Sequence, residues 1–160
     1  MPTRLHILDR VQLIPRPRPE VFAFFGDARN LEAITPGFLH FEILPPVPAR
    51  MSEGVLIDYR LSLFRVPFRW RTRIAAWVPE VRFVDVQVRG PYERWHHTHS
   101  FEDAPGGTLV RDRVEYRLPL GTLGEMAHPV FVRRTLERIF DHRQQRVAEL
   151  LGGTPGRRAA

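Results

Sequence analysis

The chain contains no cysteine, and none of its 24 basic residues is a lysine. The absence of cysteine excludes disulfide bonds, thiolate metal sites and cysteine nucleophiles. The absence of lysine excludes Schiff-base chemistry and lysine general bases. Because only three tyrosines titrate between neutrality and the arginine range, a formal net charge of +6 is enough to raise the pI to about 11.0. The high pI is therefore not in itself a sign of nucleic-acid binding.

Long apolar runs are also absent. No run approaches the length that spans a bilayer, and residues 1–6 lack the apolar core and cleavage site of a signal peptide. We therefore expect a cytoplasmic protein without integral membrane association. With 160 residues, 43% of them hydrophobic, the chain fits a single domain over 1–151, followed by a disordered tail over 152–160. We expect a monomer or a homodimer.

The most informative stretch is 90–102, in which side chains alternate with the two-residue period of a strand. One face carries Trp95, His97, His99 and Phe101. A plain aliphatic core does not supply the hydrogen-bond partners that buried imidazoles need. This face is therefore expected to form the wall of a cavity.

Alternating apolar and polar residues predict further strands on both sides of this stretch, over residues 3–14, 38–44, 55–63, 67–78, 82–89 and 108–118. Strands 55–63 and 67–78 are expected to join through a tight connection at 64–66. Apolar residues at helical spacing between 19 and 34, interrupted by Gly26, predict two short helices after the first strand.

A long helix is expected at the C-terminal end. Thr122 and Glu125 have the spacing of a capping box, and Pro129 is expected to kink or restart the helix. From Val132 onward the apolar residues recur at helical spacing and predict a stripe that faces the sheet, formed by Leu136, Ile139, Phe140, Val147, Leu150 and Leu151.

This order of elements resembles the helix-grip fold of the START, Bet v 1 and polyketide-cyclase superfamily, often called SRPBCC. The stretches that resemble its bacterial ligand-binding subgroup begin at Ile57, Pro67, Phe83, Gly90 and His97 (IDYRL, PFRW, FVDVQ, GPYERW and HTHSFE). The resemblance covers about residues 5–151. It implies an α+β fold, in which a curved antiparallel sheet of about seven strands wraps around the C-terminal helix.

The resemblance also implies a function. Members of the superfamily bind lipids, sterols, quinones or polyketides between sheet and helix, and some catalyse cyclisation or hydration there. We therefore expect a hydrophobic or aromatic small molecule as the partner, with no cofactor, or alternatively a cyclase or dehydratase reaction in the same cavity. The expected ligand-binding residues are Tyr59, Trp70, Thr72, Trp95, Phe101 and Tyr116 from the strands, with Met126, Val130 and Phe131 from the helix.

His97, His99 and Asp112 form the candidate catalytic cluster, because the inward face of strand 108–118 carries Asp112. An imidazole oriented by a carboxylate can act as a general base or acid near neutral pH. Alternatively these groups satisfy one another and only polarise the pocket, which is the favoured interpretation because buried ionisable networks also occur without catalysis. The inward face of 82–89 stays open, so Asp85 and Gln87 could join the cluster.

The sequence allows three further interpretations. His97, His99 and Asp112 could form a two-histidine, one-carboxylate metal site, but that spacing is common by chance, and we expect no bound metal. Arginines on the outer sheet face could contact nucleic acid, although interspersed glutamates favour a solvated face; they are Arg60, Arg69, Arg71, Arg73, Arg111, Arg113 and Arg117. The loop 45–54 could be a mobile lid over the cavity or a plain proline-stiffened connection.

Overall fold

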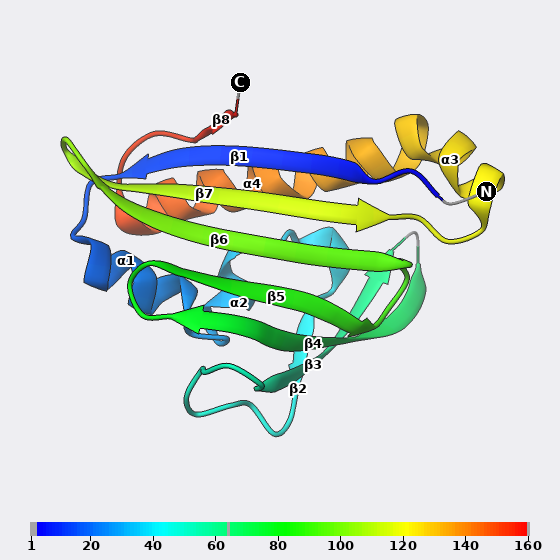
Figure 1. Cartoon of the computed structure of the whole chain (residues 1–160), viewed down its shortest axis with the longest axis horizontal. Coiled ribbons are helices and arrows are strands. Elements are labelled where there is room, and N and C mark those ends of the chain that lie inside the picture. Colours follow the sequence, from blue (N-terminus) through cyan, green and yellow to red (C-terminus); the bar gives the residue numbers. More distant parts are fainter. Residues whose placement is uncertain (1–2, 64, 160) are drawn as a thin grey trace.

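The computed structural model describes residues 3–63 and 65–159 and contains one curved antiparallel sheet (Figure 1). The sheet has eight strands in the order β2-β3-β4-β5-β6-β7-β1-β8. Their bounds are β1 His6–Ile14, β2 Glu42–Leu44, β3 Leu56–Leu63, β4 Val66–Val78, β5 Arg82–Arg89, β6 Arg94–Ala104, β7 Gly107–Arg117 and β8 Arg157–Arg158. Part of the predicted connection between β3 and β4, Phe64, lies outside the described residues.

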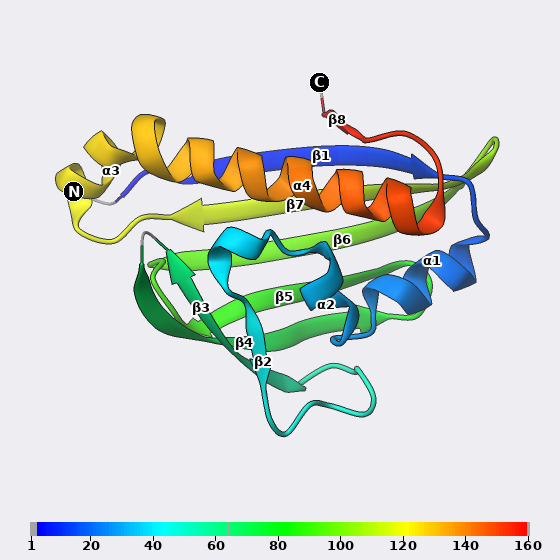
Figure 2. The same ribbon diagram turned by 180° about the vertical axis from the view of Figure 1, so that it is seen from behind.

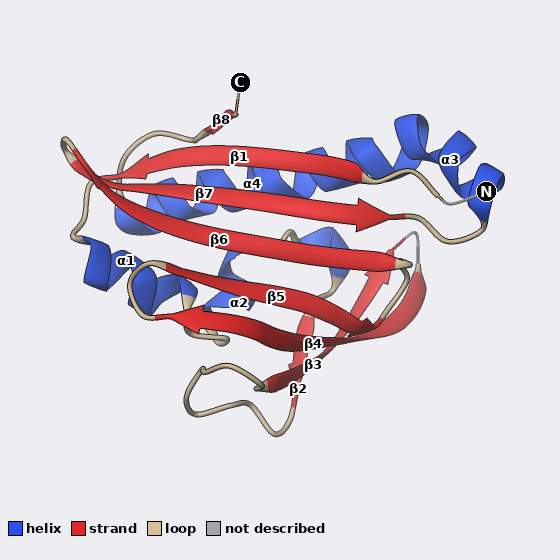
Figure 3. Ribbon diagram, in the orientation of Figure 1, coloured by secondary structure: helices blue, strands red, loops and turns tan. Residues whose placement is uncertain are grey.

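The helices all lie on one side of the sheet. In Figure 3 they are seen behind the strands, and the view from behind in Figure 2 places them in front. They are α1 Arg18–Phe25, α2 Asn30–Ile34, the 3-10 turn η1 Gly37–Leu39, α3 Gly121–Ala127, the π-helical turn η2 His128–Val132 and α4 Arg133–Leu151. The α+β helix-grip architecture predicted from the sequence is therefore confirmed, with α4 running along β1 and β7.

Curvature of the sheet creates room between its concave face and the helices. The pairing of β4 with β5 shifts register between Arg71 and Thr72 and again between Ile74 and Ala76. Such bulges bend a strand and increase its twist. The strands on the two sides of the β4–β5 pair therefore do not lie in one plane, and the sheet curves toward α4 and α2.

Helix α4 packs through one side, with Leu136, Phe140, Val147 and Leu151 buried as the apolar stripe predicts. Leu150 differs, since it is 42% exposed, and Gln144 is buried instead. The Gln144 side-chain amide donates to the carbonyl of Val11 on β1, so this polar residue fixes the helix against the sheet edge.

Two local predictions at the helix ends were wrong. The structure has no side-chain capping bond at the start of α3, where Leu120 is the capping residue with a φ of 68°. The predicted disordered tail contains β8, which pairs with Arg10 and Val11 of β1. Gly156 permits this approach, because a Cβ there would collide with Gln144 and the Val11 carbonyl. A two-residue strand held by such contacts has no periodicity that a sequence could display.

None of the helices in the described ranges, 3–63 and 65–159, is both long and apolar enough to cross a membrane.

Candidate ligand cavity

A cavity of about 420 Å³ lies between the concave face of the sheet and the helices. Its walls are mostly apolar. The sheet contributes, among others, Ile57, Tyr59, Leu61, Trp70, Thr72, Ile74, Phe83 and Trp95, and the C-terminal helices contribute Ala127, Val132, Leu136, Ile139 and Phe140. Met51, at the end of the 45–54 loop, also lines the cavity, so this loop contributes to the wall.

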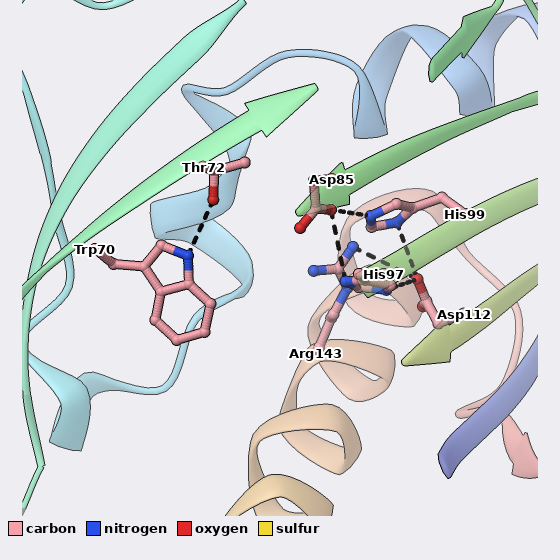
Figure 4. A network of polar contacts seen from close by, with 7 residues as sticks. All are labelled: Trp70, Thr72, Asp85, His97, His99, Asp112 and Arg143. Carbon is pink, nitrogen blue, oxygen red and sulfur yellow. Dashed lines mark hydrogen bonds and ion pairs between the residues drawn. The ribbon is translucent and has the colours of Figure 1, made fainter. Parts of the chain in front are cut away.

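Aromatic side chains gather in one part of this wall. The rings of Trp70 and Trp95 meet edge to face at 5.2 Å between centroids, and Tyr92 lies 4.9 Å from Trp95. The Trp70 indole N–H donates to the Thr72 hydroxyl at 3.1 Å (Figure 4). The structure therefore places four of the predicted ligand-binding residues on the cavity wall, namely Tyr59, Trp70, Thr72 and Trp95.

Two other predicted residues from the strands do not line the cavity. Phe101 is 1% exposed and packs edge to face on Phe22 of α1, within the core. Tyr116 lies under the helix end, where its hydroxyl is 2.7 Å from the His128 Nε2 atom. Both side chains point inward as predicted, but the helices cover this part of the inner face directly.

The three predicted helix residues also lie away from the cavity. Met126, Val130 and Phe131 are 75%, 51% and 56% exposed. Apolar side chains do not by themselves mark the inward face of this segment, because Leu123 is also 69% exposed, while Gly124, Ala127 and Val132 line the cavity. The π-helical turn over 128–132 adds a residue to one turn of the helix before Arg133. The turn includes Pro129, which lacks the N–H that an α-helical bond would need.

A polar cluster lies on three neighbouring strands at the cavity wall (Figure 4). Asp85 comes from β5, His97 and His99 from β6, and Asp112 from β7. The two imidazoles stack with centroids 3.7 Å apart. Asp85 belongs to the cluster because Phe83 and Asp85 face inward, which settles the open question of the β5 face; Gln87 instead bonds the backbone of Tyr92 at the β5–β6 turn.

The two carboxylates bracket the stacked rings. His97 Nε2 lies 2.9 Å from Asp112 Oδ1, and His99 Nε2 lies 2.6 Å from Asp85 Oδ2. His99 Nδ1 is 3.0 Å from Asp112 Oδ1, although it is not aligned for a hydrogen bond, and His97 Nδ1 is 3.6 Å from Asp85 Oδ2. Each ring nitrogen of the pair therefore lies near a carboxylate, but only the two Nε2 atoms are hydrogen-bonded.

The carboxylates of this cluster stay ionised. Burial would raise the pKa of Asp112, but the Arg143 charge and the contacts with both histidines outweigh it and hold that pKa well below its usual range. Burial likewise opposes ionisation of Asp85, and the two histidines and Arg143 again lower its pKa.

The two histidines differ in protonation. Burial and the neighbouring His99 lower the pKa of His97. For His99, burial is outweighed by its contacts with Asp112 and Asp85, so its pKa is raised. His99 is therefore the more readily protonated ring of the two, whereas His97 is neutral at neutral pH and donates its Nε2 proton to Asp112.

Arg143 of α4 was missed by the sequence reasoning, yet it lines the cavity beside the cluster. Its guanidinium lies over the Phe25 ring at 5.5 Å and 3.9 Å from Asp112 Oδ1. The signal was available, because Arg143 follows Ile139 by four residues and so lies on the apolar stripe of the helix.

The cluster is poorly arranged for a metal. The donor atoms of Asp85, His97 and His99 lie within 4.8 Å of one another, so Asp85 rather than the predicted Asp112 would complete the set. One ion cannot lie in the planes of two stacked imidazoles unless both rings leave the stack. The neighbouring Arg143 charge also opposes a cation.

On the outer sheet face several arginines form ion pairs with carboxylates. Arg60 pairs with Glu42, Arg71 with Asp58, and both Arg111 and Arg113 with Asp9. These pairs are the cross-strand chemistry of a solvated face.

Solved structures with the same fold include protein CV1439 from Chromobacterium violaceum, which is 13% identical with a TM-score of 0.68 over 92% of this chain and 98% of that one. The di-domain ARO/CYC StfQ from the steffimycin biosynthetic pathway is 13% identical with a TM-score of 0.69 over 92% of this chain and 51% of that one.

A nucleoside-diphosphate sugar epimerase from Corynebacterium glutamicum is 26% identical with a TM-score of 0.65; the match covers 89% of this chain but 28% of that one. Comparison with curated proteins gives no significant match. The sequence model of a family described as "Polyketide cyclase / dehydrase and lipid transport" matches residues 14–141, which is most of the chain. The chain therefore belongs to this family, within the SRPBCC superfamily.

Proposed function

We propose that the chain binds a hydrophobic or aromatic small molecule of the lipid, quinone or polyketide type in the cavity between the sheet and α4, and releases it unchanged. The observation that carries this proposal is the combination of a largely apolar wall with a small polar cluster in which each imidazole is hydrogen-bonded to a carboxylate. Ligand pockets are typically apolar with few polar groups, and their volumes start at about 300 Å³. The family description, which includes lipid transport, supports the same class of ligand.

The aromatic part of the wall supplies most of the expected affinity. Trp70 and Trp95 present ring surface to the cavity, and each buried aromatic contact adds apolar area removed from water. The proposal includes a cytoplasmic location and a monomeric or homodimeric state, both of which rest on the sequence.

A fluorescence titration with the neutral apolar dye N-phenyl-1-naphthylamine tests binding in the cavity. Ile139 lines the cavity from α4, so Ile139→Trp should fill part of it and weaken dye binding about tenfold or more. Leu123→Trp adds a similar side chain at an exposed position of the neighbouring helix and is the matched control. Absence of dye binding by the unmodified protein, or equal binding by the two variants, would contradict the proposal.

A second candidate function is an enzyme of the cyclase or dehydratase type. It is favoured by the surroundings of a single atom, His97 Nδ1. His97 Nδ1 is 3.6 Å from the nearest carboxylate oxygen, which is too long for a hydrogen bond, and His97 is neutral. That lone pair could accept a proton from a carbon next to a carbonyl group, with His99 and Asp112 holding the ring in place.

Deuterium exchange at the central carbon of 1-phenyl-1,3-butanedione, followed by NMR, separates the two candidates. An enzyme should accelerate this exchange, and replacing His97 and His99 together with glutamine should abolish the acceleration while dye binding persists. A carrier should give no acceleration in either form.

A further inference from the structure

The geometry points to a ligand that carries a carboxylate, bound by Arg143 at the polar end of the cavity, with its apolar body against the tryptophans. This inference rests on the proposed function, since it names the chemical class of the molecule that the cavity takes.

Arg143 is a buried cation with unused hydrogen-bond donors. Its side chain is 13% exposed, and its Nε atom is buried without a partner. The nearest carboxylate oxygen, Asp112 Oδ1, is 3.9 Å away, which is an ion-pair distance but not a hydrogen bond. Within residues 3–63 and 65–159 no acceptor takes a hydrogen bond from this guanidinium. Buried donors without acceptors cost free energy, so an acceptor supplied by a ligand would be strongly favoured.

The position of the guanidinium is already fixed. It lies over the Phe25 ring at 5.5 Å and near the Phe140 ring at 6.0 Å, which holds it at the cavity wall through cation–π contacts. Because the side chain does not have to be ordered on binding, less affinity is lost to side-chain entropy. A guanidinium also offers paired donors that match the two oxygens of a carboxylate.

The cluster beside Arg143 leaves the cation free for such a ligand. Asp112 already contacts both histidines, and Asp85 bonds His99, so neither carboxylate turns its hydrogen bonds to Arg143. Figure 4 shows Arg143 reaching toward this cluster from the helix side, opposite the strands that carry the histidines. Because Arg143 lines the cavity, the unpaired N–H donors of its guanidinium lie at the cavity wall.

The charges at this end allow a proton to accompany the anion. The ionised Asp85 and Asp112 already face the two histidines and Arg143, so a ligand carboxylate adds further negative charge to this end of the cavity. The groups that face His97 are Asp85, His99, Asp112 and Arg143, with the uncharged Tyr59 hydroxyl near Asp85 and Arg143. Among them His97 has a free Nδ1, so it can take up a proton when the anion binds.

Isothermal titration calorimetry with matched acids and amides tests the inference. The probes are dodecanoic acid with dodecanamide, and 2-naphthoic acid with 2-naphthamide, so that each pair shares its apolar body. The acid of at least one pair should bind about tenfold or more tightly than its amide, as expected for a charge-assisted hydrogen bond in a buried site. Titrations in buffers of different ionisation enthalpy should show proton uptake with the acid and none with the amide.

Arg143→Met should abolish the difference in affinity between the acid and its amide. Arg138→Met, on the exposed side of the same helix, is the control that should retain the advantage. If circular dichroism shows that Arg143→Met does not fold, Arg143→Lys, which keeps the charge, takes its place. The comparison of acid and amide binding by the wild-type protein then still decides the inference. Equal binding of acid and amide by the wild type would overturn the inference and leave cavity binding intact, whereas no binding of any probe would overturn the proposed function as well.

Discussion

The structure contains two stacked pairs of histidines close to the C-terminal helices, and the two pairs have different surroundings. His97 and His99 stack at 3.7 Å inside the sheet and contact two carboxylates. His6 of β1 and His128 of η2 stack at 3.6 Å near the end of the molecule, where His6 meets Glu125 at 2.8 Å and His128 meets the hydroxyl of Tyr116. The first pair, called the cavity pair, lines the cavity, and the second, called the end pair, lies outside its lining.

The difference shows how the surrounding carboxylates determine the charge on a buried imidazole pair. With two carboxylates against it, the cavity pair is split into one imidazole of raised pKa and one of lowered pKa. At the end pair, burial and the neighbouring His6 lower the pKa of His128. The cavity pair is thus a fixed array of charges facing the ligand space, whereas the end pair joins β1 to the helix segment.

The largest expected effect comes from removing a carboxylate of the cavity pair. Asp112→Asn leaves Arg143 and the two histidines with less countercharge in a buried site and should lower the free energy of unfolding by about 3–5 kcal/mol. Glu125→Gln, at the part-buried end pair, should cost about 1–2 kcal/mol. Urea unfolding measures both, and equal costs would contradict the distinction between the pairs.

A second prediction concerns pH. The pKa of His99 is raised above its ordinary value of 6.5, so its stabilisation is full below that pH and is lost as pH rises through the raised pKa. The pKa of His97 is lowered from 6.5, so its contribution is present above that pH and is lost as pH falls through the lowered pKa.

His99→Gln should therefore destabilise more at about pH 5.5 than at about pH 8.5, and His97→Gln should show the opposite trend. Urea unfolding of each variant and of the unmodified protein at both pH values gives the comparison. Parallel trends in the two variants would show that the pair titrates as one group.

The smallest expected effect is at the end pair. Tyr116→Phe removes the hydroxyl that meets His128 and should cost about 1 kcal/mol of unfolding free energy. Since Tyr116 does not line the cavity, the affinity for N-phenyl-1-naphthylamine should be unchanged. Weaker dye binding by this variant would place the end pair within the functional site.

The strand period explains which parts of the site could be predicted. Trp95, His97 and His99 alternate with polar residues, and Asp112 falls on the inward phase of the next strand, so the cluster was predictable from periodicity. Asp85 was not, because β5 alternates two sets of residues that could each be buried, and Phe83 and Val84 are indeed both buried.

The helix side of the cavity was less predictable. Met126 and Val130 are exposed rather than turned to the cavity, because apolar residues lie on both sides of the segment before Arg133 and do not single out its inward face. In the sequence a buried arginine such as Arg143 looks like any of the surface arginines. Only its position on the apolar stripe of the helix distinguishes it. Pairing of the tail with β1 depends on tertiary contacts at Gly156 rather than on any local pattern.

Imidazole ¹⁵N NMR with and without N-phenyl-1-naphthylamine shows whether the ligand occupies the cavity. At neutral pH we expect His97 to be a neutral ring protonated at Nε2 and His99 to be the more protonated of the two. The dye should shift the signals of this pair, while those of His6 and His128 stay in place. Unchanged signals of His97 and His99 at saturating dye, or shifts confined to His6 and His128, would contradict the claim that the ligand occupies the cavity under α4.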